Sequence, residues 1–175
     1  MSGKHKEQRV GVFVDVQNMY YSAKNLYKGA KVDFGKVLKE AVAGRKLIRA
    51  FAYVIKADIE PEQAFYEALE KQGYTVRAKD LQVFFGGAKK GDWDVGLCMD
   101  VVRHVDKVDA IVLVSGDGDF VDLLDYLRGR GIQTEVIAFG KTTSKKLVEE
   151  ADEFLNLDET PGKFLIKEKS VRQNA

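Results

Sequence analysis

Disulfide bonds and cysteine-based zinc sites are excluded by the composition of this chain. Cys98 is the one cysteine among 175 residues, so no intramolecular disulfide can form. Such a composition is typical of a reducing compartment. No apolar run reaches the roughly 18 residues that a membrane-spanning helix requires, and residues 1–9 lack the apolar stretch of a signal peptide. We therefore expect a cytoplasmic protein that does not associate with membranes.

The chain also lacks an excess of charge of either sign. It contains 28 Lys and Arg residues against 27 Asp and Glu residues, and its formal net charge is +1. A nucleic-acid-binding protein with this balance needs a local basic patch, because bulk positive charge is absent. Two groups of lysines follow expected strands and are candidates for such a patch: Lys79, Lys89 and Lys90, and Lys141, Lys145 and Lys146.

Proline is scarce, and its two positions indicate where structure starts or stops. Pro61 suits the first turn of a helix, whereas Pro161 suits the end of the folded body. A chain of this length is sufficient for one domain with a hydrophobic core. We expect a polar N-terminal tail at residues 1–8, one domain at residues 9–160 and a C-terminal tail at residues 161–175, of which residues 164–166 could dock on the body.

Strand-like and helix-like segments alternate between these ends. Short apolar runs predict strands buried on both faces, and apolar residues at helical spacing predict amphipathic helices. The expected strands are residues 10–14, 47–55, 75–78, 110–114, 134–139 and a short one at 154–155; the expected helices are residues 18–27, 34–43, 62–72, 94–105, 120–130 and 143–151. This alternation predicts an α/β three-layer sandwich with a mostly parallel central sheet.

Aspartates follow two of the expected strands. Asp15 comes directly after the first strand, and Asp117 and Asp119 follow the fourth. If the strand order is 3-2-1-4-5, the first and fourth strands are neighbours, and Asp15 and Asp117 face each other at the edge where such sheets bind ligands. Carboxylates so close repel one another unless a cation lies between them or one is protonated. Mg²⁺ or Mn²⁺ suits such ligands, although either aspartate could instead only cap a helix.

A third acid is expected near this pair, and the residues leave its identity open. Asp94 begins a helix, where it could join the cluster or merely complement the helix dipole. Asp92 and Asp100 are the alternatives, although Asp100 points about 120° away from Asp94 around the helix. Asn18 could hold a metal-bound water or a phosphate, or simply begin a helix. Trp93, Tyr20 and Tyr21 are aromatic residues that could stack on bases or pack in the protein.

Three motifs stand out along the chain: Phe13-Val14-Asp15-Val16-Gln17-Asn18, Lys90-Gly91-Asp92-Trp93-Asp94-Val95-Gly96-Leu97-Cys98-Met99-Asp100 and Val114-Ser115-Gly116-Asp117-Gly118-Asp119-Phe120. Together they resemble the motifs of the NYN domain, and more narrowly those of the LabA-like branch of the PIN-like nucleases. The resemblance runs from about residue 9 to residue 158. It implies a PIN-like fold and metal-dependent hydrolysis of RNA, with single-stranded RNA as the expected partner.

The resemblance also implies a role for particular residues. By motif match, Asp15, Asp94, Asp117 and Asp119 are the catalytic and metal-binding acids, and Asn18, Ser115, Lys79, Lys89 and Lys90 are the substrate-binding residues. The Lys-Gly-x-Asp pattern of the family is one residue longer in this chain, which keeps Asp92 as an alternative to Asp94.

Three other functions compete with that of a ribonuclease. A haloacid-dehalogenase-like phosphatase needs a second aspartate two residues after the one that follows strand one, and Gln17 stands there. A response-regulator receiver needs adjacent acids at the same place, and this pair is missing. The non-enzymatic alternative is an RNA-binding or regulatory module of the same fold, which could work as a homodimer.

Overall fold

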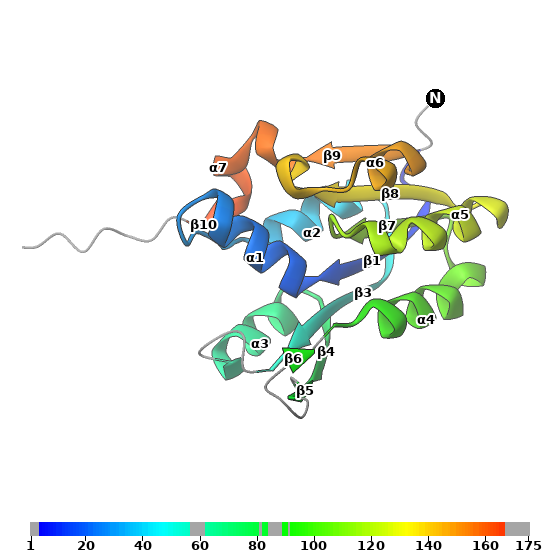
Figure 1. The fold of residues 1–175 in the computed structure, drawn as a ribbon. Coiled ribbons are helices and arrows are strands. Elements are labelled where there is room, and N and C mark those ends of the chain that lie inside the picture. The colour runs from blue at the N-terminus through cyan, green and yellow to red at the C-terminus, as the bar shows by residue number, and fades with distance from the viewer. Residues whose placement is uncertain (1–3, 57–61, 81, 84–88, 91, 167–175) are drawn as a thin grey trace, which may run out of the picture.

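A six-stranded parallel sheet forms the centre of the computed structural model, which describes residues 4–56, 62–80, 82–83, 89–90 and 92–166 (Figure 1). The strands lie in the order β4-β3-β1-β7-β8-β9, and every neighbouring pair is parallel. Their bounds are β1 (Arg9–Asp15), β3 (Lys46–Ile55), β4 (Thr75–Lys79), β7 (Ala110–Val114), β8 (Gln133–Ala138) and β9 (Glu153–Asn156). The predicted α/β fold with a parallel sheet is confirmed.

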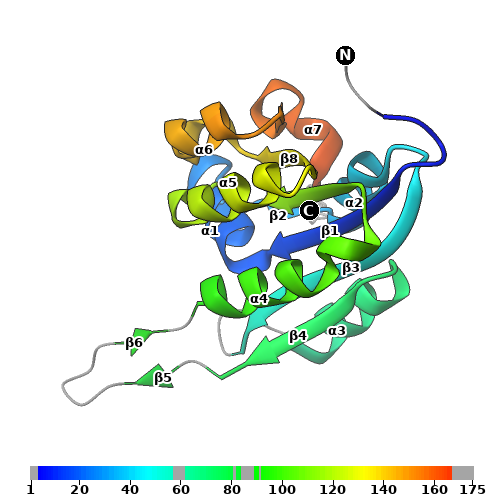
Figure 2. The same ribbon diagram turned by 90° about the vertical axis from the view of Figure 1, so that its right-hand side faces the viewer.

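Helices cover both faces of this sheet (Figure 2). One face is packed against α1 (Val16–Leu26), α2 (Phe34–Val42) and α3 (Glu62–Lys71), and the other against α4 (Asp94–His104), α5 (Val121–Gly129) and α6 (Lys145–Glu150). Single turns of 3-10 helix follow at η1 (Val105–Lys107), η2 (Gly118–Phe120), η3 (Gly140–Thr142) and η4 (Leu157–Glu159). None of the helices in the described part of the chain has the length and apolar character that a membrane span requires.

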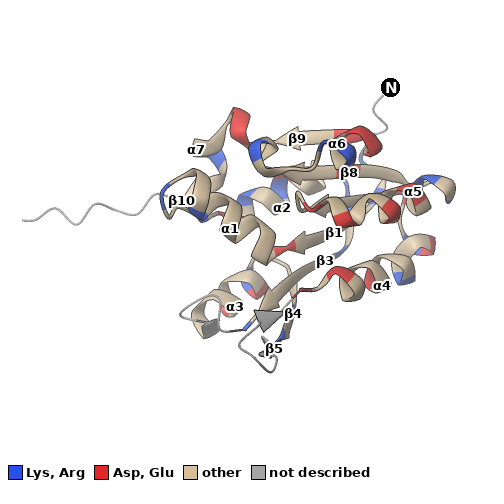
Figure 3. Ribbon diagram, viewed as in Figure 1, with Lys and Arg blue, Asp and Glu red and all other residues tan. Residues whose placement is uncertain are grey.

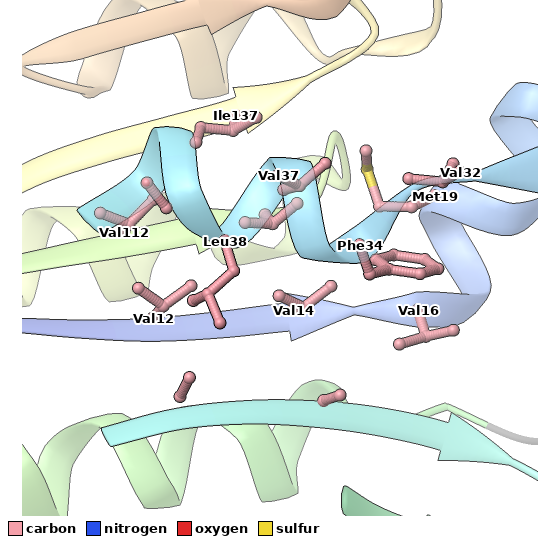
Figure 4. Close-up of a cluster of buried hydrophobic side chains, with 14 of the residues drawn as sticks. Val12, Val14, Val16, Met19, Val32, Phe34, Val37, Leu38, Val112 and Ile137 are labelled. Atoms are coloured by element: carbon pink, nitrogen blue, oxygen red, sulfur yellow. The ribbon is translucent and has the colours of Figure 1, made fainter. Parts of the chain in front are cut away.

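The continuous apolar runs of the strands supply two separate cores. Side chains of successive strand residues point to opposite faces, so Val12 and Val14 of β1 pack toward α2, whereas Phe13 packs toward α4 and α5. Figure 4 shows Val12, Val14, Val37 and Leu38 within the first of these cores. Because β1 and β7 are buried on both faces, their interior residues do not alternate between apolar and polar side chains.

The strands β1 and β7 are in register, and this places the site. Val14 lies opposite Val114 in the parallel pair. Since both strands run in the same direction, the residues that follow them emerge at the same edge of the sheet. Asp15 and Ser115 are the first residues at that edge.

Residues from both predicted tails belong to the folded body. At the C-terminal end, Phe164 of α7 (Pro161–Phe164) is 2% exposed. The strand β10 (Leu165–Ile166) then pairs with β2 (Lys31–Val32). At the N-terminal end, Gln8 is buried. Residues 164–166 therefore dock on the body, as the sequence allows, and Phe164 lies in the first core; the side chain of Gln8 accepts a hydrogen bond from Arg45 at 2.9 Å. A further antiparallel pair, β5 (Gln82–Val83) and β6 (Lys89–Lys90), follows β4.

Candidate metal centre

Three carboxylates meet at the carboxyl edge of the sheet. Asp15 ends β1, Asp117 follows β7, and Asp94 begins α4; one oxygen of each lies within 4.8 Å of an oxygen of the other two. Figure 3 shows the acidic segments at the end of β1 and the beginning of α4 on the same side of the molecule. One divalent cation can contact all three carboxylates at this separation. An all-oxygen, all-anionic donor set suits Mg²⁺ or Mn²⁺.

Helix capping fixes two of these carboxylates. One oxygen of Asp15 accepts a hydrogen bond from the Asn18 amide at 3.3 Å, which caps α1. Likewise, Oδ1 of Asp117 accepts from the Asp119 amide at 2.9 Å and caps η2. The sequence left helix capping and membership of an acidic cluster as alternative roles for Asp15 and Asp117. In the structure both aspartates do both, because the caps orient the carboxylates that form the cluster.

Ser115 and Asn18 join the two loops that carry these aspartates. The Ser115 hydroxyl donates to Oδ2 of Asp15 at 3.1 Å and accepts from the Asp117 amide at 3.2 Å. Oδ1 of Asn18 accepts from the Gly116 amide at 2.9 Å. Ser115 is fully buried, and its hydroxyl is engaged between two members of the cluster; its contact with substrate stays a prediction. Asn18 keeps part of its surface on the crevice beside the site.

The electrostatics of the cluster disfavour three negative charges without a cation. Burial, and then the nearby charges of Asp117, Asp92 and Asp15, raise the pKa of Asp94 to about 7. Burial also raises the pKa of Asp15 to about 6, although hydrogen bonds from Asn18 and Ser115 oppose this change. A divalent cation would relieve the repulsion that these shifts reflect. The residues therefore fit a metal ion by number, chemistry and charge.

We expect the metal-free protein to become less stable as the pH rises from about 4 to about 7. Because the pKa values of Asp15 and Asp94 lie above the ordinary value of 3.8, the folded state binds more protons than the unfolded chain in this range, and the free energy of unfolding falls with pH. Asp94→Asn should remove part of this loss and stabilise the metal-free protein at pH 8 by about 1–2 kcal/mol, since solvent screens part of the repulsion. Thermal melting in EDTA measures it; identical pH profiles for both proteins would contradict it.

The other predicted acids lie in different surroundings. Asp119 is exposed and outside the group of three, although a hydrogen bond with it contributes to the raised pKa of Asp94. Asp92 lines the crevice. Asp100 is buried and accepts hydrogen bonds from the Tyr53 hydroxyl at 2.8 Å and from Arg77 at 2.7 Å. Asp100 is thus a buried carboxylate paired with the partly exposed Arg77, and Asp94 is the third acid of the cluster.

The structure describes some of the basic and aromatic side chains that were predicted for the site. The Nζ atom of Lys79 lies 4.7 Å from the ring centroid of Trp93. Trp93 also donates through its ring nitrogen to the Val54 carbonyl at 3.0 Å and contacts Tyr53. Trp93 is therefore anchored in the protein by these contacts, and its ring is partly buried. The side chains of Lys89 and Lys90 lie outside the described residues.

An open crevice of about 360 Å³ surrounds the cluster. Its lining consists of four acids and six uncharged residues: Asp15, Asp92, Asp94, Asp117, Gln17, Asn18, Tyr21, Ser22, Asn25 and Thr142. Sequence reasoning missed the uncharged wall apart from Asn18 and the ambiguous Tyr21. The signal that could have revealed it is the recurrence of polar residues every three to four positions along α1, the spacing of one helix face.

Comparison with known proteins finds relatives over most of the chain. The chain is 28% identical over 163 residues to the low amplitude and bright protein LabA of Synechococcus elongatus, an alignment that covers 88% of this chain and 86% of LabA. The crystal structure of VPA0982 from Vibrio parahaemolyticus, described as a protein of unknown function, superposes with a TM-score of 0.83 at 32% identity. That match covers 95% of this chain and all of the other. Residues 9–158 match the NYN domain, and the chain therefore belongs to the NYN domain family.

Proposed function

We propose that this protein is a metal-dependent ribonuclease that hydrolyses phosphodiester bonds in single-stranded RNA. The observation that carries the proposal is the group of three carboxylates within 4.8 Å at the carboxyl edge of the sheet. It occurs in a chain of the NYN family, whose members are generally nucleases. A metal site without this family membership would leave the reaction open.

The residues of the cluster have separable tasks in this reaction. Asp15, Asp94 and Asp117 would hold Mg²⁺ or Mn²⁺, which when bound neutralises charge on the phosphate and supplies an activated water. Ser115 and the caps at Asn18 and Asp119 orient the carboxylates. The ammonium group of Lys79, held over Trp93 next to Asp94, supplies positive charge for the RNA backbone.

The alternative functions receive less support. Gln17, which occupies the position of the second phosphatase aspartate, lines the crevice as an amide and cannot act as the acid of that mechanism. A non-catalytic RNA-binding module would not need three mutually repelling carboxylates, because they weaken the attraction for phosphate.

Cleavage of labelled single-stranded RNA by the purified protein tests the proposal. We expect fragments with Mn²⁺ or Mg²⁺ and none in EDTA, and activity should return when excess metal is added back. A DNA strand of the same sequence serves as the comparison substrate. Metal-dependent RNA binding without fragments would contradict the proposal and favour the binding module; cleavage that persists in EDTA would contradict the role of the cluster.

A further inference from the structure

The crevice has two ends of different chemistry. Asp15, Asp92, Asp94 and Asp117 form one end, and six uncharged residues form the rest of its lining. No lysine or arginine in the described part of the chain lines it. Among the described residues, a second phosphate group would therefore meet only carboxylates and neutral groups there. The uncharged end is suited to a neutral, hydrogen-bonding part of the substrate.

The uncharged end is mainly one face of α1. Gln17, Tyr21 and Asn25 follow one another at intervals of four residues, and Asn18 and Ser22 lie beside them on the helix. The helix begins at its cap Asp15, so this face starts at the acidic cluster and extends about 12 Å along the helix axis from Gln17 to Asn25. Any group bound along it is adjacent to a phosphate at the cluster.

The opposite side of this end is held in place by a direct contact. Thr142 of η3 donates a hydrogen bond from its hydroxyl to the hydroxyl of Ser22 at 3.0 Å. The amide of Thr142 is in turn bonded to the Phe139 carbonyl at 3.1 Å. The loop after β8 and the helix α1 thus form a fixed wall instead of two independent surfaces.

Tyr21 gives this wall an aromatic surface. Its side chain is 39% exposed, and its ring lies 5.4 Å from that of Tyr20 in an edge-on arrangement. Tyr20 itself packs against the first core, so the Tyr21 ring rests against an anchored neighbour. Exposed aromatic rings of this kind bind nucleobases by stacking, without sequence preference.

We propose that this face of α1 is a nucleoside subsite, in which Tyr21 stacks on a base and the amides of Gln17 and Asn25 bind the base edge or the ribose hydroxyls. The inference rests on the proposed function, since it assigns the nucleoside adjoining the phosphate at the cluster. Amide side chains suit this role because each offers both donors and acceptors, as do ribose hydroxyls. The crevice of about 360 Å³ lies near the lower limit of ligand sites, about 300–1,000 Å³, and so fits one nucleotide.

Calorimetric titration in Mn²⁺ with adenosine 5′-monophosphate and with ribose 5-phosphate tests the subsite. The nucleotide should bind about tenfold more tightly, because only it carries a base that can stack. Tyr21→Ala should remove this preference and leave ribose 5-phosphate binding unchanged. The matched control is Tyr126→Ala on α5, which replaces a tyrosine of similar exposure, 38%, outside the crevice and should keep the preference.

The outcomes separate this proposal from the nuclease assignment. Equal affinity for both probes, or equal behaviour of the Tyr21→Ala and Tyr126→Ala proteins, would overturn the subsite even if the protein cleaves RNA. A base-dependent preference that Tyr21→Ala removes supports the subsite even in a protein that cleaves no RNA, and in that case only the proposed function fails.

Discussion

Asp117→Asn is expected to lower metal-dependent RNA cleavage by at least about 100-fold, since even residues that only support metal ligands contribute 10- to 100-fold. The substitution is chosen to spare the local structure. Oδ1 of Asp117 caps η2 by accepting from the Asp119 amide, and asparagine caps as well as aspartate. The substitution removes the negative charge of one of the three clustered carboxylates. Initial rates over a Mn²⁺ titration measure the effect.

The control for this variant is Asp125→Asn, the same chemical change at an exposed position of α5. It should cleave RNA at the wild-type rate. Thermal melting gives an independent readout, because a metal at 100 times its dissociation constant stabilises the folded state by about 2.7 kcal/mol. Wild-type protein and the Asp125→Asn control should show this shift with Mn²⁺, and Asp117→Asn should show much less. Equal rates or equal shifts in the two variants would refute the assignment of the cluster.

The sequence predicts the sheet well because its central strands are continuous apolar runs. Ala110–Val114 is an unbroken apolar run, and in the structure all five residues are buried. Capping aspartates and glycines mark many of the helix ends, so the helices lie close to their expected limits. The strands that were missed, β2, β5, β6 and β10, are each two residues long. The pairing of β2 with β10 depends on the docking of Phe164, and strands this short leave no periodic pattern in the sequence.

The sequence predicts those site residues that lie at the ends of strands. Asp15 and Asp117 could be predicted because each lies at the carboxyl end of one of two neighbouring parallel strands. The third acid depends on how α4 is rotated and where it begins, which the sequence leaves open among Asp92, Asp94 and Asp100. The structure decides this through packing: Arg77 and Tyr53 hold Asp100 away from the cluster. The motif position of Ser115 predicts a contact with substrate, and only the structure reveals that its buried hydroxyl links Asp15 to the Asp117 amide.

Long-range ion pairs have no sequence signal at all, and one of them spans the amino-terminal side of the sheet. The guanidinium of Arg45 donates to both carboxylate oxygens of Glu135 at 2.7 and 2.8 Å. It also donates to the carbonyls of Ala41 and Val42 at the end of α2. The two side chains are 1% and 6% exposed. This pair joins α2 to β8 at a distance in sequence of 90 residues.

Arg45→Ala is therefore expected to lower the free energy of unfolding by about 3–5 kcal/mol, because it leaves the Glu135 carboxylate buried without its partner. The Nζ atom of Lys4, at 3.6 Å from Glu135 and 37% exposed, is a weak substitute. Urea unfolding at pH 7 measures the loss. A double variant, Arg45→Met with Glu135→Leu, should recover most of the stability, since apolar groups of similar size replace buried ion pairs at little cost.

The same variants separate stability from the site. Arg45 and Glu135 lie near the amino ends of the strands, whereas the acidic cluster lies at the carboxyl ends, so Mn²⁺ should still raise the melting temperature of the Arg45→Ala protein by about as much as that of the wild type. A loss below about 1 kcal/mol would show that water or Lys4 already compensates Glu135. If the double variant is no more stable than Arg45→Ala, the stabilising partners of Arg45 are the carbonyls at the end of α2. The charge of Glu135 would then not be the cause of the loss.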